Sequence, residues 1–310
     1  MKQSFYSNGK LLITGEYFIL DGALGLAVPT TCGQDLIVDA KTHNTLVWKS
    51  FSNTGDIWLE VAFDLPKLRL VSASYEATED GGKETLAESL SAILVAVREL
   101  NPEFLMNSKG VEVQTNLTFP KDWGLGTSST LIANIAEWAK VDSYKLLEKT
   151  FGGSGYDIAC AKANGPILYN LNQGIAEASE VTFNPPFKDQ LFFVYLNKKQ
   201  NSRLGIQRYK ELHGNLNDAL IQINKITEQF LKCKNLAEFE VLIEAHEALV
   251  SKMIQLSPVK DKLFDDYYGA VKSLGAWGGD FVLVTGDHNT KAYFEEKGYH
   301  TIIKYNDLIL

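Results

Sequence analysis

The stretch of this chain best suited to bind an anion is a glycine-rich loop that ends in consecutive hydroxyl residues. It runs from Pro120 to Thr130 and contains Gly124, Gly126 and the run Thr127-Ser128-Ser129. The apolar spacing over 131–139 predicts a helix directly after it. A helix N-terminus offers unpaired N–H groups and the positive end of the helix dipole, which favour a phosphate. The sequence therefore predicts a phosphate-binding loop here.

Two well-known phosphate loops do not fit this stretch. A Walker A loop needs a lysine and a hydroxyl residue directly after its last glycine, and no lysine follows Gly126. A Rossmann fingerprint needs a third glycine, which is missing. An ordinary capped helix after a turn fits these residues equally well, so the rest of the chain has to decide between the two interpretations.

The composition describes a globular protein with an acidic surface. The chain has 310 residues, of which 45% are hydrophobic and 22% charged, and its formal net charge is −8. This length allows two domains. The negative charge makes nucleic acid and anionic membranes poor candidates for the main partner, so we predict a small-molecule substrate, no nucleic acid and no membrane. The sequence leaves the oligomeric state open.

The cysteines and the apolar runs predict a cytoplasmic protein. Cys32, Cys160 and Cys233 are widely separated and lack the paired spacing of zinc or redox motifs, which indicates a reducing compartment. The first ten residues lack the apolar run of a signal peptide, and no stretch is long and apolar enough to cross a bilayer.

Apolar periodicity predicts a strand-rich first quarter and a helix-rich second half. The predicted strands cover 11–20, 25–29, 36–40, 45–48, 57–61, 111–117, 167–169, 191–196, 281–285 and 300–305. The predicted helices cover 83–100, 131–139, 143–149, 158–163, 203–231, 236–256, 259–274 and 290–297. The pair Pro185-Pro186 predicts a boundary between an N-terminal domain, residues 1–186, and a C-terminal domain, residues 187–310.

Four motifs stand in an order that resembles the GHMP small-molecule kinases, which include galactokinase, homoserine kinase, mevalonate kinase and phosphomevalonate kinase. They are Gly9-Lys10-Leu11-Leu12-Ile13-Thr14-Gly15-Glu16-Tyr17, the loop 124–129, Ser154-Gly155-Tyr156-Asp157 and Lys272-Ser273-Leu274-Gly275-Ala276-Trp277-Gly278-Gly279-Asp280. The resemblance covers nearly the whole chain. It implies an α+β fold with two domains, the first like ribosomal protein S5 domain 2 and the second ferredoxin-like, with the active site between them.

The resemblance also implies roles in phosphoryl transfer, which chiefly needs positioning and charge neutralisation. Asp157 would be the base that accepts the proton of the attacking group, and Lys10 would lie beside it. ATP and Mg²⁺ would be required, with Ser128 as a metal ligand. Six residues would wrap the phosphates of ATP: Gly124, Leu125, Gly126, Thr127, Ser128 and Ser129.

Further residues have implied roles of the same kind. In some members a glutamate before the Ser-Gly-x-Asp turn completes the metal site; Glu148 is the nearest candidate, although its spacing to Asp157 differs from that pattern. Lys272 would add positive charge. The expected substrate contacts are Glu16, Gly275, Ala276, Gly278 and Gly279. A loop with Lys198, Lys199, Ser202 and Arg203 would contact an anionic substrate group or would simply be solvated. The five histidines show no ligand spacing and are interpreted as structural or surface residues.

Two positions depart from the resemblance. Trp277 stands where a glycine is usual, and its indole would narrow the pocket, stack on a ligand or mark a changed or lost substrate. Thr130 stands where a small residue is common. The residue types at Tyr17 and Asp280 resemble those of phosphomevalonate kinases at the same motif positions, whereas the length of the chain is nearer to that of mevalonate kinases. We therefore predict transfer of the γ-phosphoryl group of ATP to phosphomevalonate or mevalonate, with phosphomevalonate slightly favoured.

Three alternatives stay open. The first is a kinase of the same fold for another small alcohol. The second is an enzyme like the mevalonate-diphosphate decarboxylases, which also spend ATP on a mevalonate derivative. The third is a nucleotide-binding protein that has this fold and no turnover.

Overall fold

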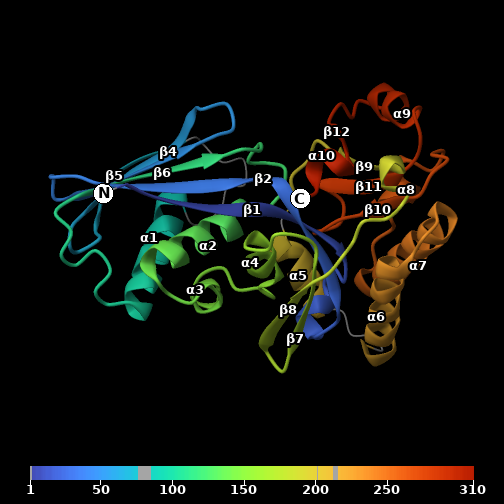
Figure 1. The fold of residues 1–310 in the computed structure, drawn as a ribbon, viewed down its shortest axis with the longest axis horizontal. Coiled ribbons are helices and arrows are strands. Elements are labelled where there is room, and N and C mark those ends of the chain that lie inside the picture. The colour runs from blue at the N-terminus through green and yellow to red at the C-terminus, as the bar shows by residue number, and fades with distance from the viewer. Residues whose placement is uncertain (1, 76–84, 201, 212–215) are drawn as a thin grey trace. The chain divides into compact units, whose positions relative to one another are not determined.

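A computed structural model describes residues 2–75, 85–200, 202–211 and 216–310 (Figure 1). Its contacts divide the chain into two compact units, and each unit is built from separate stretches of sequence. Unit 1 contains Met1–Gly9, Cys32–Lys121 and Gly126–Lys162, and unit 2 contains Lys10–Thr31, Asp122–Leu125 and Ala163–Leu310. The division into domains at residue 186 stays a prediction.

The sheet of unit 1 has the strand order β5-β4-β3-β6-β2, and β1 pairs with β2. The strands are β1 (Lys2–Thr14), β2 (Gly25–Ala40), β3 (Thr45–Phe51), β4 (Ile57–Asp64), β5 (Leu70–Tyr75) and β6 (Val111–Leu117). In β6 every second residue is buried, because successive side chains of a strand point to opposite faces. The strand-rich first quarter is confirmed by β1 to β5, but the strand predicted over 11–20 ends at Thr14, and η1 (Phe18–Asp21) follows it.

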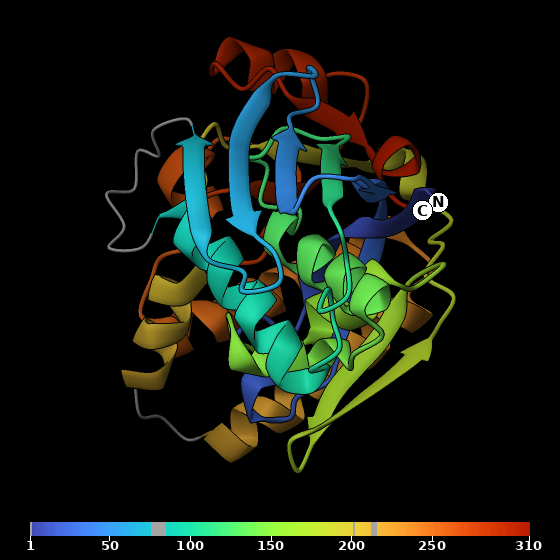
Figure 2. The ribbon, with the colours of Figure 1, turned by 90° about the vertical axis from the view of Figure 1, so that its left-hand side faces the viewer.

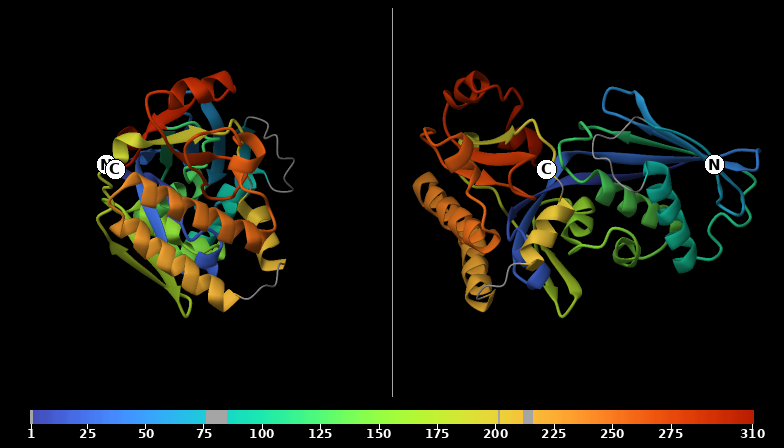
Figure 3. Two further views of the ribbon diagram at one scale, coloured as in Figure 1. Left: turned by 90° about the vertical axis from the view of Figure 1, so that its right-hand side faces the viewer. Right: turned by 180° about the vertical axis from the view of Figure 1, so that it is seen from behind.

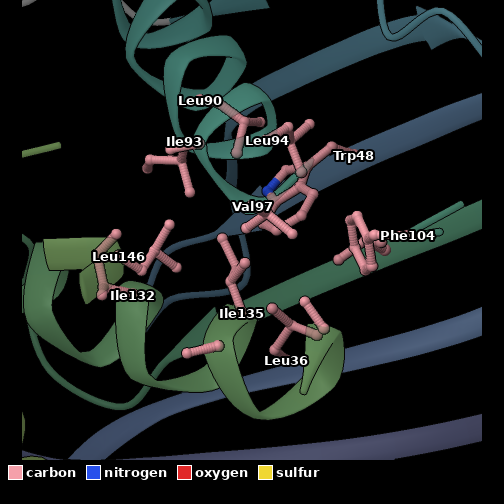
Figure 4. Close-up of a cluster of buried hydrophobic side chains, with 14 of the residues drawn as sticks. Leu36, Trp48, Leu90, Ile93, Leu94, Val97, Phe104, Ile132, Ile135 and Leu146 are labelled. Atoms are coloured by element: carbon pink, nitrogen blue, oxygen red, sulfur yellow. The ribbon is translucent and has the colours of Figure 1, made fainter. Parts of the chain in front are cut away.

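The helices of unit 1 lie together on one side of this sheet (Figures 1 and 2). They are α1 (Leu86–Leu100), α2 (Thr127–Ala139), α3 (Ser143–Lys149) and α4 (Tyr156–Ala161). Thr85 and Glu88 form a capping box at the start of α1, and the Asp142 side chain caps α3 by accepting from the Tyr144 and Lys145 N–H groups. Between sheet and helices lies an apolar core in which Trp48 meets side chains of α1 and α2 (Figure 4).

Unit 2 contains a four-stranded antiparallel sheet with the order β10-β11-β9-β12. Its strands are β9 (Leu191–Tyr195), β10 (Val271–Ser273), β11 (Phe281–Thr285) and β12 (Ile302–Lys304). Helices follow β9 and β11, which gives the β-α-β-β-α-β succession of a ferredoxin-like fold. Two long helices, α6 (Leu216–Lys232) and α7 (Leu236–Ile254), run side by side, and α7 packs against β10 (Figure 3).

The remaining elements of unit 2 are short. They are η1 (Phe18–Asp21), β7 (Ile167–Asn172), β8 (Ile175–Glu180), η2 (Lys188–Gln190), α5 (Ser202–Glu211), α8 (Val259–Leu263), α9 (Thr290–Glu296) and α10 (Tyr305–Leu308). The first residues of β2 pair with β7, which in turn pairs with β8. Within the described ranges no helix is both long and apolar enough to span a bilayer.

Several predicted elements need correction. The helix predicted over 259–274 is wrong: α8 ends at Leu263, and 271–273 form β10, because their backbone pairs with β11. The strands predicted at 25–29 and 36–40 are one continuous strand, β2. The pattern over 203–231 forms two helices, α5 and α6, and 212–215 lie outside the described residues, as do 83 and 84 of the helix predicted over 83–100.

Candidate functional site

The first turn of α2, in unit 1, has the features of an anion site. Gly126 caps this helix with φ = +98°, a left-handed conformation that glycine adopts without strain. No side chain of the described residues caps the helix, so the first N–H groups keep their capacity to bind an anion. Ser128 is exposed, whereas the Ser129 hydroxyl is buried and donates to the Gly126 carbonyl at 3.0 Å. Of these two hydroxyls, only that of Ser128 faces solvent.

Buried polar contacts within unit 1 fix the position of α2. The Thr130 hydroxyl lies 2.6 Å from Oε1 of Gln34, a residue of β2. Asn134 donates to the Gln34 carbonyl at 2.9 Å and accepts from the Ser7 hydroxyl at 2.7 Å. These contacts attach one side of α2 to β1 and β2. Thr130, where a small residue is common, thus has a structural role.

Asp157 lies in the first turn of α4, behind Gly155, which has φ = +82°. Its side chain is half-buried, and its Oδ1 accepts from the Ile158 N–H at 3.1 Å. Burial raises the pKa of the Tyr144 phenol, and the charges of Asp142 and Asp157 raise it further. The Tyr144 phenol therefore lies within electrostatic range of Asp157.

The oxygen donors near the start of α2 suit a magnesium ion that phosphate groups and water hold in the main, with few ligands from the protein. Across the described residues, no three His, Cys, Asp or Glu side chains gather closely enough to hold a metal. Mg²⁺ typically takes one or two protein oxygens together with substrate phosphates and water. The exposed hydroxyl of Ser128 fits that pattern. Glu148 is an exposed residue of α3, a helix that packs against α2.

In unit 2, Lys10 is fixed to the first residues of the glycine-rich loop. Its backbone N–H donates to the Leu125 carbonyl at 2.9 Å, and its Nζ donates to the Gly124 carbonyl at 3.1 Å. Gly124 presents its carbonyl to Lys10 with φ = +67°, a left-handed conformation that glycine adopts without strain.

Asp280 lies directly against Gly124 in the same unit. A Cβ on Gly124 would come within 2.6 Å of the Asp280 carboxylate, so a larger residue has no space there. Asp280 Oδ1 accepts from the Gln200 N–H at 3.0 Å. Burial raises the pKa of Asp280, while that hydrogen bond and the nearby charges of Lys10 and Lys199 oppose the rise. Asp280 thus joins the third motif to the loop that Lys10 contacts.

The loop of the third motif connects β10 to β11, and Trp277 anchors it. The indole is 2% exposed and belongs to an apolar cluster with Tyr17, Phe18 and Tyr209. Its backbone has φ = +33°, an uncommon value for a bulky residue, and its carbonyl accepts from Gln200 Nε2 at 2.9 Å. The indole therefore fills the interior of unit 2.

Glu16 and Lys272, two predicted site residues, meet in the interior of unit 2. Lys272 Nζ donates to Glu16 Oε1 at 2.6 Å, and the two side chains are 0% and 1% exposed. His246 Nε2 lies 3.0 Å from Glu16 Oε2. Burial opposes ionisation of Glu16, but Lys272 and His246 outweigh it and lower the pKa of this carboxyl. Glu16 is therefore a buried carboxylate with a lysine partner.

The cluster has two further members, Glu247, which has no predicted role, and His246, which is predicted only as a structural or surface histidine and is buried. They lie on α7, on the stripe with Phe239, Ile243 and Val250 that is buried at helical spacing. Two adjacent polar residues on an apolar stripe are a signal for a buried polar cluster that the sequence already contains. Ser202 and Arg203 are predicted to contact an anionic substrate group or to be solvated, and their side chains lie outside the described part of the chain.

Comparison with known proteins identifies the fold. Neither a protein-family model nor a curated protein matches the sequence. Among solved structures, the mevalonate kinase of Methanococcus jannaschii has a TM-score of 0.69 at 15% identity, over 98% of this chain and 96% of that one. The Streptococcus pneumoniae phosphomevalonate kinase in complex with phosphomevalonate and AMPPNP gives 0.66 at 15% identity, over 95% of each chain. The Lactococcus lactis galactokinase complexed with galactose gives 0.64 at 15%, over 96% and 88%.

These similarities define a class of structure. The chain has the two-domain α+β fold of the GHMP kinases, as its motifs predict. Within that class, its fold is similar to the mevalonate and phosphomevalonate kinases.

Proposed function

We propose that this protein is an ATP-dependent kinase for a small metabolite, with phosphomevalonate or mevalonate as the acceptor. The observation that carries the proposal is the uncapped first turn of α2, which follows a left-handed glycine and presents the exposed hydroxyl of Ser128. This arrangement suits the phosphates of a nucleotide. The fold, shared with the kinases named above, supports the same conclusion.

Each proposed residue has one task. Asp157 accepts the proton of the attacking oxygen, and Lys10 offsets the charge that develops on the transferred phosphoryl group. The backbone from Gly124 to Ser129 binds the phosphates of ATP. The Ser128 hydroxyl, with Glu148 as the second candidate, would hold Mg²⁺, which supplies positive charge next to the phosphates.

The acceptor is tested directly with the purified protein. ATP and Mg²⁺ are incubated with mevalonate, phosphomevalonate, homoserine, galactose or no acceptor, and ADP release and product mass are measured. We expect ADP release with mevalonate or phosphomevalonate alone. Lys10→Met should remove most of it, while Lys2→Met, an exposed lysine at the other end of β1, serves as the matched control. ATP binding without acceptor-dependent ADP release would contradict the proposal.

A further inference from the structure

Buried ionisable side chains in unit 2 form a cluster that phosphate binding and proton transfer do not use. Glu16 follows β1, Lys272 belongs to β10, and His246 and Glu247 are neighbours on α7. All four are buried, and Lys272 and His246 have no exposed surface. Burial of charged groups is costly, so their presence in the interior calls for a role.

Each oxygen of Glu16 lies beside a buried nitrogen atom. Oε1 accepts from Lys272 Nζ at 2.6 Å, whereas Oε2, which has no assigned hydrogen-bond partner among the described residues, lies 3.0 Å from His246 Nε2. In a neutral imidazole, Nε2 of His246 either donates to Glu16 or accepts from the Gly15 N–H at 3.3 Å. The adjacent Glu16 carboxylate favours the tautomer in which Nε2 donates. A substrate group could reach Glu16 only by displacing one of these partners and leaving a buried charge unpaired.

The same contacts fix one end of the third-motif loop. Lys272 Nζ also donates to the Ser273 carbonyl at 3.0 Å, and the Ser273 hydroxyl donates to Glu247 Oε2 at 2.8 Å. One residue later, the Leu274 N–H donates to the Phe281 carbonyl at 3.3 Å and closes the loop. At the other end of the loop, Asp280 lies against Gly124, whose carbonyl accepts from Lys10. The cluster is therefore linked to Lys10 through the loop.

The charges of the cluster balance when Glu247 is protonated. Burial raises the pKa of Glu247 to about 8, and Lys272 and the Ser273 hydroxyl only partly oppose it. Burial also lowers the pKa of His246, as does Lys272, although Glu16 opposes this. Both shifts favour the neutral forms of Glu247 and His246 around the ion pair of Glu16 and Lys272.

We propose that Glu16 is a positioning residue: through Lys272 it fixes the segment from Leu274 to Asp280, and it does not contact the acceptor. This replaces the substrate-binding role that the motif resemblance implies for Glu16. The kinetic part of the proposal rests on the proposed function, whereas the structural part applies to the protein without any ligand.

The test is a double-mutant cycle with two readouts. Wild type, Glu16→Gln, Lys272→Met and the double variant are compared by hydrogen exchange of the amides from 274 to 280, without ligand, and by steady-state kinetics. Lys252→Met, an exposed lysine of α7, is the matched control. If a single variant does not fold, the double variant still tests the link, because it leaves neither buried charge unpaired.

We expect each single variant to speed hydrogen exchange of these amides by about tenfold or more. Because both substitutions break the same link between Glu16 and Lys272, exchange in the double variant should be no faster than in the faster of the two single variants. The turnover rate should fall while the acceptor KM stays within about twofold. If the amides of Glu16→Gln exchange at the wild-type rate and its acceptor KM is raised, the proposal is overturned. A wild type that turns over no acceptor would refute the proposed function, while the exchange result would still decide the role of Glu16.

Discussion

Unit 1 keeps the polar residues of the proposed site at or near its surface, whereas unit 2 also buries some of them. In unit 1, Ser128 is exposed and Asp157 is half-buried, and both belong to helices that pack on an apolar core. In unit 2, Lys10 is half-buried, while Glu16 and Lys272 pair inside the unit. The comparison teaches that residues of the same set of motifs can have different roles. An exposed residue is able to contact a ligand, whereas a buried residue with a partner stabilises the position of other parts of the protein. The predictions below test that distinction.

The largest effect on stability is expected for the buried pair. Lys272→Met leaves the Glu16 carboxylate without its partner and should lower the free energy of unfolding by about 3–5 kcal/mol. Urea unfolding followed by circular dichroism measures this loss. Ser128→Ala should change the same quantity by less than about 0.5 kcal/mol, as is usual at an exposed position. Equal losses in the two variants would remove the contrast between the units.

A smaller effect, dependent on pH, is expected for Glu247. Its pKa is raised from the unfolded value of about 4.3 to about 8. Its protonated form therefore stabilises the fold at low pH, and this stability is lost as pH rises from the unfolded pKa through the folded pKa of about 8. Glu247→Gln, which keeps the neutral form, should exceed the unfolding free energy of wild type by about 1 kcal/mol at pH 5, and by about 2 kcal/mol or more at pH 8.

Thermal and urea unfolding between pH 5 and pH 8 check this prediction. Glu244→Gln, an exposed glutamate on the same helix, is the control and should follow wild type throughout. A Glu247→Gln protein whose advantage does not grow with pH would show that Glu247 is ionised in the fold.

Two adjacent serines of α2 should separate binding from stability. Ser128→Ala removes the exposed hydroxyl proposed to hold Mg²⁺ beside the phosphates and should weaken the binding of ATP with Mg²⁺ about tenfold. Ser129→Ala removes a buried hydroxyl that donates to Gly126, and should cost about 1 kcal/mol of stability with little change in ATP affinity. Calorimetric titration with ATP measures the affinities. The reverse pattern would mean that the site lies elsewhere.

The smallest effect is expected for Trp277→Phe. The ring would still pack against Tyr17 and Tyr209, while an indole N–H without a partner in the described residues would be removed. Loss of packing and relief of that buried donor act in opposite directions, so the unfolding free energy should change by less than about 1 kcal/mol. An unchanged stability together with a raised acceptor KM would show instead that the indole touches the substrate.

Local patterns predicted the elements that depend on local contacts. The alternation in β6 and the helical stripe of α2 come from burial on one face, which sequence spacing records directly. The helix predicted over 259–274 failed because the apolar spacing at 271–273 serves a strand, whose pairing with β11 is a contact to residues further along the chain. Periodicity over a short apolar run does not distinguish these cases.

The motif resemblance selected some residues that the structure places in contact, but it did not predict their surroundings. The motif resemblance selected Glu16 and Lys272, which the structure pairs across 256 positions of sequence. It did not select His246 and Glu247, because no motif contains them; they join through the packing of α7 on β10. The position of Trp277 in an apolar cluster also depends on helices distant in sequence, so the residue type alone left several roles open.

The most direct test of the proposed kinase concerns Asp157. Asp157→Asn keeps the size of the side chain and removes its capacity to accept a proton, and Glu103→Gln, an exposed carboxylate of unit 1, is the control. In single-turnover reactions with ATP and the acceptor, we predict that phosphoryl transfer falls by about 10²–10⁴-fold while ATP affinity stays within about twofold. An Asp157→Asn protein that transfers the phosphoryl group at the wild-type rate would contradict the account.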